Sequence, residues 1–435
     1  MNRAIARSAG SGRRRLGLLS AGGLYAAAFC AGSIVVTARP LHAQERILSS
    51  RFFGAGASYE SIAFGGSGLS QTAFGGLDST RITRVRQFTF PITGAMPLGA
   101  GWRLDVTTLY SSGSVTYTDP TAGNATRTAA LSGVSDMRVR ATGRVVGDGL
   151  IVTVGANAPT GRTSLNATEF SALRILSAPA LGMGSTPVGS GPSGTVGLVL
   201  PQQLGGWSMA YGVSYEFRGR YQPVAALSAG SSSADFTPGG VVRASVSGDH
   251  TVGPHRLSIA VATDVFGEDK LKSQAAADAA GNSSGQSVAT VRLGPVFSAD
   301  AQLQIAAPRV RELLAYTSYR WRAPFARDGK TVERSSGRYV ETGVRSAWSL
   351  GPGRDLTVSG DVRWQSGLGI DLGLPTAGVT NGGVTVGMNL RRGLIAIQPY
   401  VRAQAGSLTQ RTATVNKPTQ AFTGAAAGIV FTSRF

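Results

Sequence analysis

Residues that commonly carry out catalysis are scarce in this sequence. Beyond the N-terminal segment there are only two histidines, His250 and His255, and the single cysteine is Cys30. The two histidines bracket a short connection between two predicted strands, where a base, a nucleophile and an orienting acid are hard to bring together. We therefore expect both to be turn residues, and we predict no catalytic residues and no enzymatic activity.

Candidate ligands for a metal ion are equally few. Asp264, Glu268 and Asp269 form one tight acidic cluster in a predicted external loop, and carboxylate oxygens are ligands that Ca²⁺ accepts. Solvated loop carboxylates are the simpler interpretation. The many Gly-x-Gly runs lack the following Lys-Ser of a phosphate-binding loop. The sequence thus predicts no metal site, no cofactor and no cofactor-binding residues.

Charged side chains recur at alternate positions of extended segments. In 207–220, apolar and aromatic residues from Trp207 to Phe217 alternate with polar ones. Since successive side chains of a strand point to opposite faces, the pattern predicts strands with one apolar and one polar face. If the polar faces enclose a lumen, the charged residues that line it are Arg138, Arg140, Arg144, Glu216, Arg218, Arg220, Glu312, Arg320, Arg322, Glu341, Arg345, Asp361, Arg363 and Arg402.

This charged set has two interpretations. The arginines and acids can pair across neighbouring strands and simply hold the wall in shape. Alternatively, the excess of arginine can form an electropositive constriction that favours anionic solutes, as rings of charge do in pores.

The N-terminal 43 residues read as a signal peptide. Five arginines precede an apolar run from Leu16 to Val36, and Leu41-His42-Ala43 approximates a small-residue cleavage site. An uncleaved anchor is the alternative, because the run is about long enough to span a bilayer. Residues 1–43 hold six arginines and no acid, so the net charge falls from +19 to +13 on removal. The remaining arginines are scattered, which argues against nucleic-acid binding.

Residues 44–435 are expected to form one transmembrane antiparallel up-and-down β-barrel. Composition alone also suits a large soluble β protein, with 60 glycines and only 15% charged residues. However, short Gly-rich turns alternate with long polar segments along the chain, which is the rhythm of an outer-membrane barrel. We predict about 16 strands, with 14 as the alternative if the first segment is a plug. This prediction treats the segments 119–132 and 222–237 as external loops and the segment 285–305 as one strand.

The longest connection, 159–193, is predicted to carry a short helix. Asn166 and Glu169 have the spacing of a capping box, and Phe170, Leu173 and Leu176 would form its apolar face. A segment of this length is usually functional or disordered. It could fold inward as a constriction or stand outside as a lid.

The C-terminal strand carries a possible assembly signal. Ile429, Phe431 and Phe435 fall on one face of a strand that finishes at the chain end. A terminal Phe in this register resembles the sequence that the barrel-assembly machinery reads on outer-membrane proteins. We expect that machinery to be a partner of the chain.

Several motifs over residues 133–220 resemble the outer-membrane channel family named for the meta-cleavage pathway of phenol degradation, which is related to fatty-acid transporters of the outer membrane. They are Gly133-Val134-Ser135-Asp136, Pro159-Thr160-Gly161, Gly189-Ser190-Gly191, Gly194-Thr195-Val196-Gly197-Leu198 and Tyr215-Glu216-Phe217-Arg218-Gly219. The resemblance implies a channel for small hydrophobic or aromatic compounds. The Asn-Pro-Ala motif of the long-chain fatty-acid transporters is missing, which argues against a lateral fatty-acid route.

The sequence therefore favours a passive outer-membrane channel or transporter for small hydrophobic, aromatic or anionic organic solutes. Its expected surroundings are outer-membrane lipid and lipopolysaccharide, whose anionic groups suit a basic barrel. A structural or surface-binding barrel with a blocked lumen is the alternative, and an outer-membrane enzyme is a third.

Overall fold

The computed structural model describes residues 51–66, 68–70, 80–99, 101–145, 149–177, 181–183, 188–224, 234–274, 286–308, 310–333, 335–366, 376–411 and 416–434. The predicted signal peptide and the terminal Phe435 lie outside these residues. Among those described, no helix combines the length and hydropathy needed to cross a membrane.

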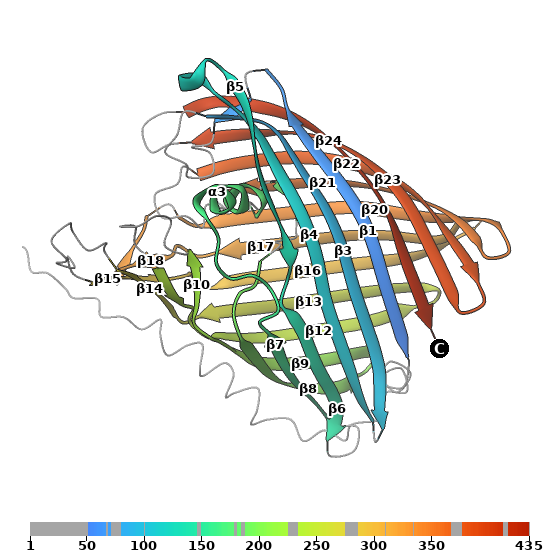
Figure 1. Ribbon diagram of the computed structural model, residues 1–435. Coiled ribbons are helices and arrows are strands. Elements are labelled where there is room, and N and C mark those ends of the chain that lie inside the picture. Colours follow the sequence, from blue (N-terminus) through green and yellow to red (C-terminus); the bar gives the residue numbers. More distant parts are fainter. Residues whose placement is uncertain are drawn as a thin grey trace, which may run out of the picture. The chain divides into compact units, whose positions relative to one another are not determined.

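The dominant element is a closed antiparallel β-barrel with 16 strand positions in its wall (Figure 1). Each strand pairs with its neighbour in the chain, and the last strand closes the ring by pairing with the first from Phe52↔Arg434 to Phe64↔Phe422. The wall strands are β1 (Phe52–Phe64), β3 (Arg81–Gly99), β4 (Trp102–Asp119), β5 (Ala125–Val134) with β6 (Met137–Val145), β7 (Leu150–Ala158), β8 (Ser193–Leu204), β9 (Trp207–Arg218), β12 (Val241–Val252), β13 (His255–Phe266), β16 (Val296–Ala307), β17 (Val310–Arg322), β20 (Gly337–Gly351), β21 (Arg354–Ser366), β22 (Thr376–Arg392), β23 (Ile395–Arg411) and β24 (Asn416–Arg434).

The predicted strand number is confirmed, and the first segment is a wall strand and not a plug. β5 and β6 share one wall position, because both pair with β4 on either side of a break at Ser135-Asp136. The expectation of a loop over 119–132 is wrong: only a short 3₁₀ turn η2 (Pro120–Ala122) separates β4 from β5.

Tight turns connect the strands at one end of the barrel. Gly205, Gly253, Gly353 and Gly393 have φ between +56° and +69°. Residues with a Cβ rarely adopt such angles, so glycine is needed where only two residues reverse the chain. Both chain ends of the wall, at Phe52 and Arg434, lie at this same end.

The long connections at the opposite end build a second, smaller sheet. Its strands are β10 (Tyr221–Val224), β11 (Ala234–Thr237), β14 (Glu268–Gln274), β15 (Gln286–Arg292), β18 (Ala326–Arg327) and β19 (Lys330–Thr331). The predicted single strand 285–305 is therefore wrong, because β15 belongs to this sheet and β16 to the barrel. Gly294-Pro295 separates them, and proline cannot donate to a ladder. A two-residue strand, β2 (Leu69–Ser70), pairs with β3.

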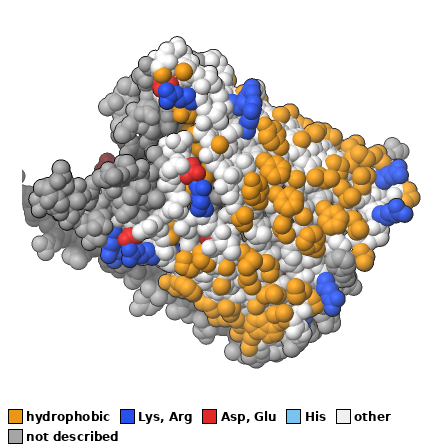
Figure 2. Space-filling model, in the orientation of Figure 1, with side chains coloured by type: hydrophobic (Ala, Val, Ile, Leu, Met, Phe, Trp, Pro, Cys, Tyr) orange, Lys and Arg blue, Asp and Glu red, His pale blue; other side chains and the backbone are white. Residues whose placement is uncertain are grey.

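The outer face of the wall is apolar. Exposed hydrophobic side chains such as Val246, Val261, Val344 and Val384 lie on it. On the face drawn in Figure 2, hydrophobic side chains gather in a broad band, with Lys and Arg side chains beyond its borders. Aromatic residues mark both borders: Trp102, Trp207 and Trp348 towards the tight turns, and Tyr110, Tyr215, Trp321 and Trp364 towards the second sheet. An apolar band between two aromatic girdles is the surface that a transmembrane barrel presents to lipid.

Candidate functional site: the lumen and its inward loop

The base of the loop 159–193 is fastened by one buried carboxylate. Asp136 is 6% exposed; its Oδ1 accepts a hydrogen bond from the Gly161 N–H at 3.0 Å, and its Oδ2 accepts one from the Ser190 N–H at 2.7 Å. A Cβ added at Gly189 would lie 2.5 Å from Asp136 Oδ1. The Gly-Val-Ser-Asp, Pro-Thr-Gly and Gly-Ser-Gly motifs thus meet at this carboxylate, which holds both ends of the loop together.

This contact leads to a prediction for Asp136→Ala. The change leaves two backbone N–H groups at the loop base without their acceptor, at a cost of about 1–3 kcal/mol each if they stay buried. We expect the loop to open locally and trypsin to cleave after Arg162 faster than in the parent barrel. Asp249→Ala, at the other end of the barrel, is the matched control. Equal cleavage rates in all three proteins would contradict the role of Asp136.

The loop contains one helix, α3 (Ala167–Leu176), with the predicted capping box. The Asn166 side chain accepts from the Glu169 N–H at 2.9 Å, and the Glu169 carboxylate accepts from the Asn166 N–H at 3.0 Å. Glu169 also pairs with Arg162 at 2.5 Å. The hydrogen bond from Arg162, aided by the Asn166 N–H, holds the pKa of Glu169 below its ordinary value.

Helix α3 lies on the inner face of the barrel wall (Figure 1). Its buried side chains Ala172, Ile175 and Leu176 belong to one apolar cluster with wall residues of seven strands: Ile62, Val85, Val115, Leu131, Val379, Leu408 and Phe422. By strand register these wall residues share the face that carries Glu60, Gln87 and Gln404. The buried face is therefore broader than the predicted Phe170, Leu173 and Leu176, of which only Leu176 is fully buried.

The chain after the helix extends towards another part of the wall. A Cβ added at Gly182 would lie 2.2 Å from Nη1 of Arg363, which belongs to β21. In contrast, Leu176 packs on Gly113 of β4, where an added Cβ would lie 2.6 Å from Leu176 Cδ1. Strands β22, β23, β24, β1 and β3 separate β21 from β4 in the ring, so the described part of the loop contacts the inner face along an arc of neighbouring strands.

On the same inner face, charged side chains have hydrogen-bonding partners on other strands. Arg402 donates two hydrogen bonds to Asp361, at 2.6 and 2.8 Å. The Gln404 side chain donates to Glu60 at 2.8 Å. Gly383 separates β21 from β23 here, and a Cβ at this position would lie 2.3 Å from Arg402 Nη2. The glycine thus lets the guanidinium cross one strand to reach its partner.

The other predicted lumen residues fall into two groups. Strand register puts Arg138, Arg140, Arg144, Glu216, Arg218, Glu312, Arg320, Glu341, Arg345 and Arg363 on the same inner face as Arg402 and Asp361. Within this group Arg218 donates to the Gly239 carbonyl at 2.8 Å, Arg320 lies 5.7 Å from the ring centre of Tyr339, and the Tyr339 hydroxyl donates to Glu341.

The other two predicted lumen residues, Arg220 and Arg322, contact segments beyond the ends of their strands. Arg220 follows β9 and pairs with Asp235 of the second sheet. Arg322 is only 7% exposed, and its Nη2 donates to the Ser335 carbonyl at 3.0 Å, so it fastens the segment after β17. Sequence alternation could not show this, because it gives the face of a strand but not what covers its end.

The two histidines hold structural contacts. The His250 ring stacks on Trp207 at 4.8 Å between ring centres, and its Nδ1 lies 2.9 Å from the Gly206 carbonyl. His255 Nδ1 accepts from the Ala306 N–H at 3.3 Å. Both flank the tight turn between β12 and β13, as the sequence predicts.

The acidic cluster is divided among basic and backbone partners. Asp264 lies 3.7 Å from Arg243, and Asp269 accepts from the Gly239 N–H at 2.6 Å. Burial raises the pKa of Asp269, against the opposing effects of that N–H and of Arg218. In the part of the chain that the structure describes, no three His, Cys, Asp or Glu residues come together as a candidate metal site.

No family model matches the sequence, and no curated protein does. Among solved structures, OprB of Pseudomonas putida aligns over 90% of this chain and 96% of its own, with 11% identity and a TM-score of 0.41. A mutant of TodX, a monoaromatic hydrocarbon channel, aligns over 89% and 91%, with 10% identity and a TM-score of 0.41. An outer-membrane channel from Pseudomonas putida F1 aligns over 89% and 96%, with 10% identity and a TM-score of 0.32.

Each of these similarities is to an outer-membrane barrel, and what those proteins transport is a property of those proteins. The class of this chain follows from its own architecture. A closed antiparallel barrel with an even strand number, an apolar band between aromatic girdles, and tight turns opposite long connections is an outer-membrane β-barrel.

Proposed function

We propose that this barrel is a passive channel for small organic solutes, and that the loop 159–193 constricts its lumen. The observation that carries the proposal is the position of α3, which packs on the inner face of a 16-strand wall. A barrel of this size encloses more space than its own side chains fill. A helix that occupies part of that space narrows the passage and limits which solutes pass.

The charge of the inner face suggests which ions pass more readily. Arg138, Arg140 and Arg345 have no ion pair among the described residues, whereas Asp361 is neutralised by Arg402. Unpaired guanidinium groups raise the local concentration of anions in a narrow, water-filled pore. The proposed solutes are therefore small anionic or aromatic compounds, as expected from the sequence.

Single-channel conductance of the refolded chain in a planar bilayer tests this function. We expect discrete conductance steps, and a reversal potential under a salt gradient that shows anion preference. Heat-modifiable migration on a gel confirms that the barrel has folded. Folded protein that gives no current in several salts would contradict the channel and favour the structural or surface-binding barrel.

Residues on the outside of the barrel suggest two interaction partners. We propose that the assembly machinery reads β24, where Ile429 and Phe431 face outwards and the Phe431 ring contacts Phe53 at 6.3 Å. Lipopolysaccharide is proposed to contact the basic rim, where Lys270 and Lys272 are exposed on β14. Slower assembly of Phe431→Ser in cells, with unchanged refolding in detergent, would support the first of these contacts; equal rates in cells would exclude it.

A further inference from the structure

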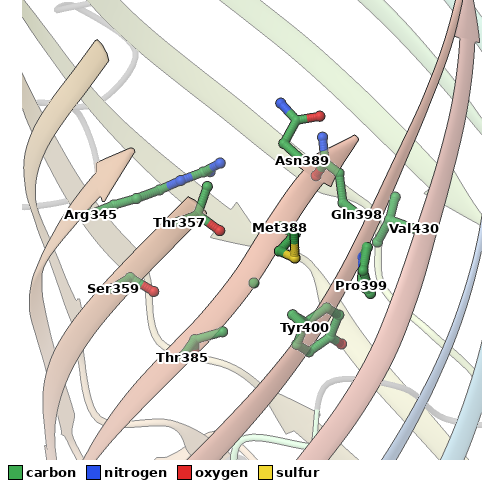
Figure 3. Close-up of a pocket in the computed structure, with 11 residues that line it drawn as sticks. Arg345, Thr357, Ser359, Thr385, Met388, Asn389, Gln398, Pro399, Tyr400 and Val430 are labelled. Atoms are coloured by element: carbon green, nitrogen blue, oxygen red, sulfur yellow. The ribbon is translucent and has the colours of Figure 1, made fainter. Parts of the chain in front are cut away.

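A pocket of about 170 Å³ opens on the inner face of the wall, in the half of the barrel nearer the tight turns. Five consecutive strands, β20 to β24, contribute to its lining. Figure 3 shows Arg345 extending towards Thr357, with Asn389 and Gln398 close to each other and Tyr400 on the same strand as Gln398. No sequence motif or helix contact described above accounts for this recess.

The pocket lies where the pairing between β22 and β23 is interrupted next to Pro399. Strands β22 and β23 pair regularly up to Gly387↔Tyr400, and pairing resumes only at Leu390↔Ile397. Proline has no N–H to donate, so Pro399 in the middle of a strand interrupts the ladder. The register is the same on both sides of this gap, and Met388, Asn389, Gln398 and Pro399, which lie in it, all line the pocket.

The lining combines one available cation with neutral polar groups and an aromatic ring. Arg345 is exposed to the lumen, and among the described residues it has no ion pair. The two aspartates of the neighbouring strand β21 already have arginine partners, since Asp361 pairs with Arg402 and Asp355 pairs with Arg311 at 2.9 Å. Thr357 and Gln398 add hydrogen-bonding groups beside the guanidinium.

We propose that this pocket is a binding site for a compact organic carboxylate on its way through the lumen. The planar guanidinium of Arg345 can hold a carboxylate through two parallel hydrogen bonds. The ring of Tyr400 and the side chain of Val430 would contact the apolar body of the solute. A cavity of about 150 Å³ holds a benzene molecule, so the pocket has the size of a single-ring acid.

The inference deepens the proposed channel function, and its test is arranged so that the two can fail separately. The test measures benzoate binding to the refolded full barrel in detergent micelles by isothermal titration calorimetry, independently of any current. We expect Arg345→Gln to weaken benzoate binding by roughly tenfold or more, because hydrogen bonds to charged groups are the stronger class. Arg345→Lys should retain part of the affinity, since lysine keeps the positive charge but lacks the two parallel N–H donors of the guanidinium group.

Arg243→Gln is the matched control, because it removes one inner-face arginine of β12, on another part of the wall. Benzyl alcohol, which has the ring but no carboxylate, should bind more weakly than benzoate. The pocket is excluded as a carboxylate site if benzoate does not bind, or if Arg345→Gln and Arg243→Gln lose the same affinity for benzoate. It is also excluded if benzyl alcohol binds as tightly as benzoate. A barrel that binds benzoate but conducts no ions would contradict the proposed channel function, while the proposed binding site would stand.

Discussion

Replacing Leu176 by Asp is expected to open the lumen. Leu176 is fully buried in the apolar cluster between α3 and the wall, and it packs directly on Gly113. Loss of a buried leucine alone costs about 2–5 kcal/mol, and an unpaired carboxylate in that cluster adds to the cost. The helix should therefore leave the wall, while the barrel, whose strands pair independently of the loop, remains closed.

The size of the effect follows from the shift in population. Each 1.4 kcal/mol changes the ratio of two states about tenfold, so the unpacked state should gain roughly a hundredfold or more. In single-channel recordings, long open events of higher conductance should replace brief or small ones. Thr168→Asp is the matched control, because Thr168 is exposed in the first turn of α3, where a negative charge is favourable. Identical conductance in the parent and both variants would show that α3 does not constrict the lumen.

A lipid-facing arginine should be the most damaging change to the wall itself. Val246 lies in the middle of β12 on the apolar outer face and is 39% exposed. An arginine at the bilayer midplane of a barrel costs about 2–4 kcal/mol. We therefore expect Val246→Arg to lower the free energy of unfolding by that amount when the barrel is titrated with denaturant in liposomes.

The adjacent residue supplies the control for this prediction. Ser247 points to the opposite face of β12 and is exposed to the lumen, so Ser247→Arg places the same charge in water and should change stability little. A similar loss of stability in both variants would mean that the inner and outer faces have been assigned incorrectly.

The sequence by itself determined the wall. Alternation of side chains is a local property, because each strand carries its own apolar and polar face. Strand β9, from Trp207 to Arg218, could therefore be placed to within a few residues, and so could most of its neighbours. Glycines at tight turns such as Gly205 and Gly353 were equally readable, because their positive φ angles are local requirements.

One of the two wrong strand predictions could have been avoided from the sequence. Gly294-Pro295 marks the break between β15 and β16, and attention to that pair would have divided the segment 285–305 correctly. The error over 119–132 had no such marker, because apolar and polar residues do not alternate regularly along Ala125–Val134.

Only the tertiary structure decided the direction of α3 and the pairing of the lumen charges. The capping box predicts a short helix after Asn166, but the apolar face of a helix can pack inside the barrel or outside it. The deciding contacts join α3 to Val115, Leu131 and Phe422, which meet only after the ring has closed. Likewise, Arg402 reaches Asp361 across one intervening strand because Gly383 lies between them. These contacts depend on the register of segments far apart in the chain, and register is a property of the closed barrel and not of any one strand.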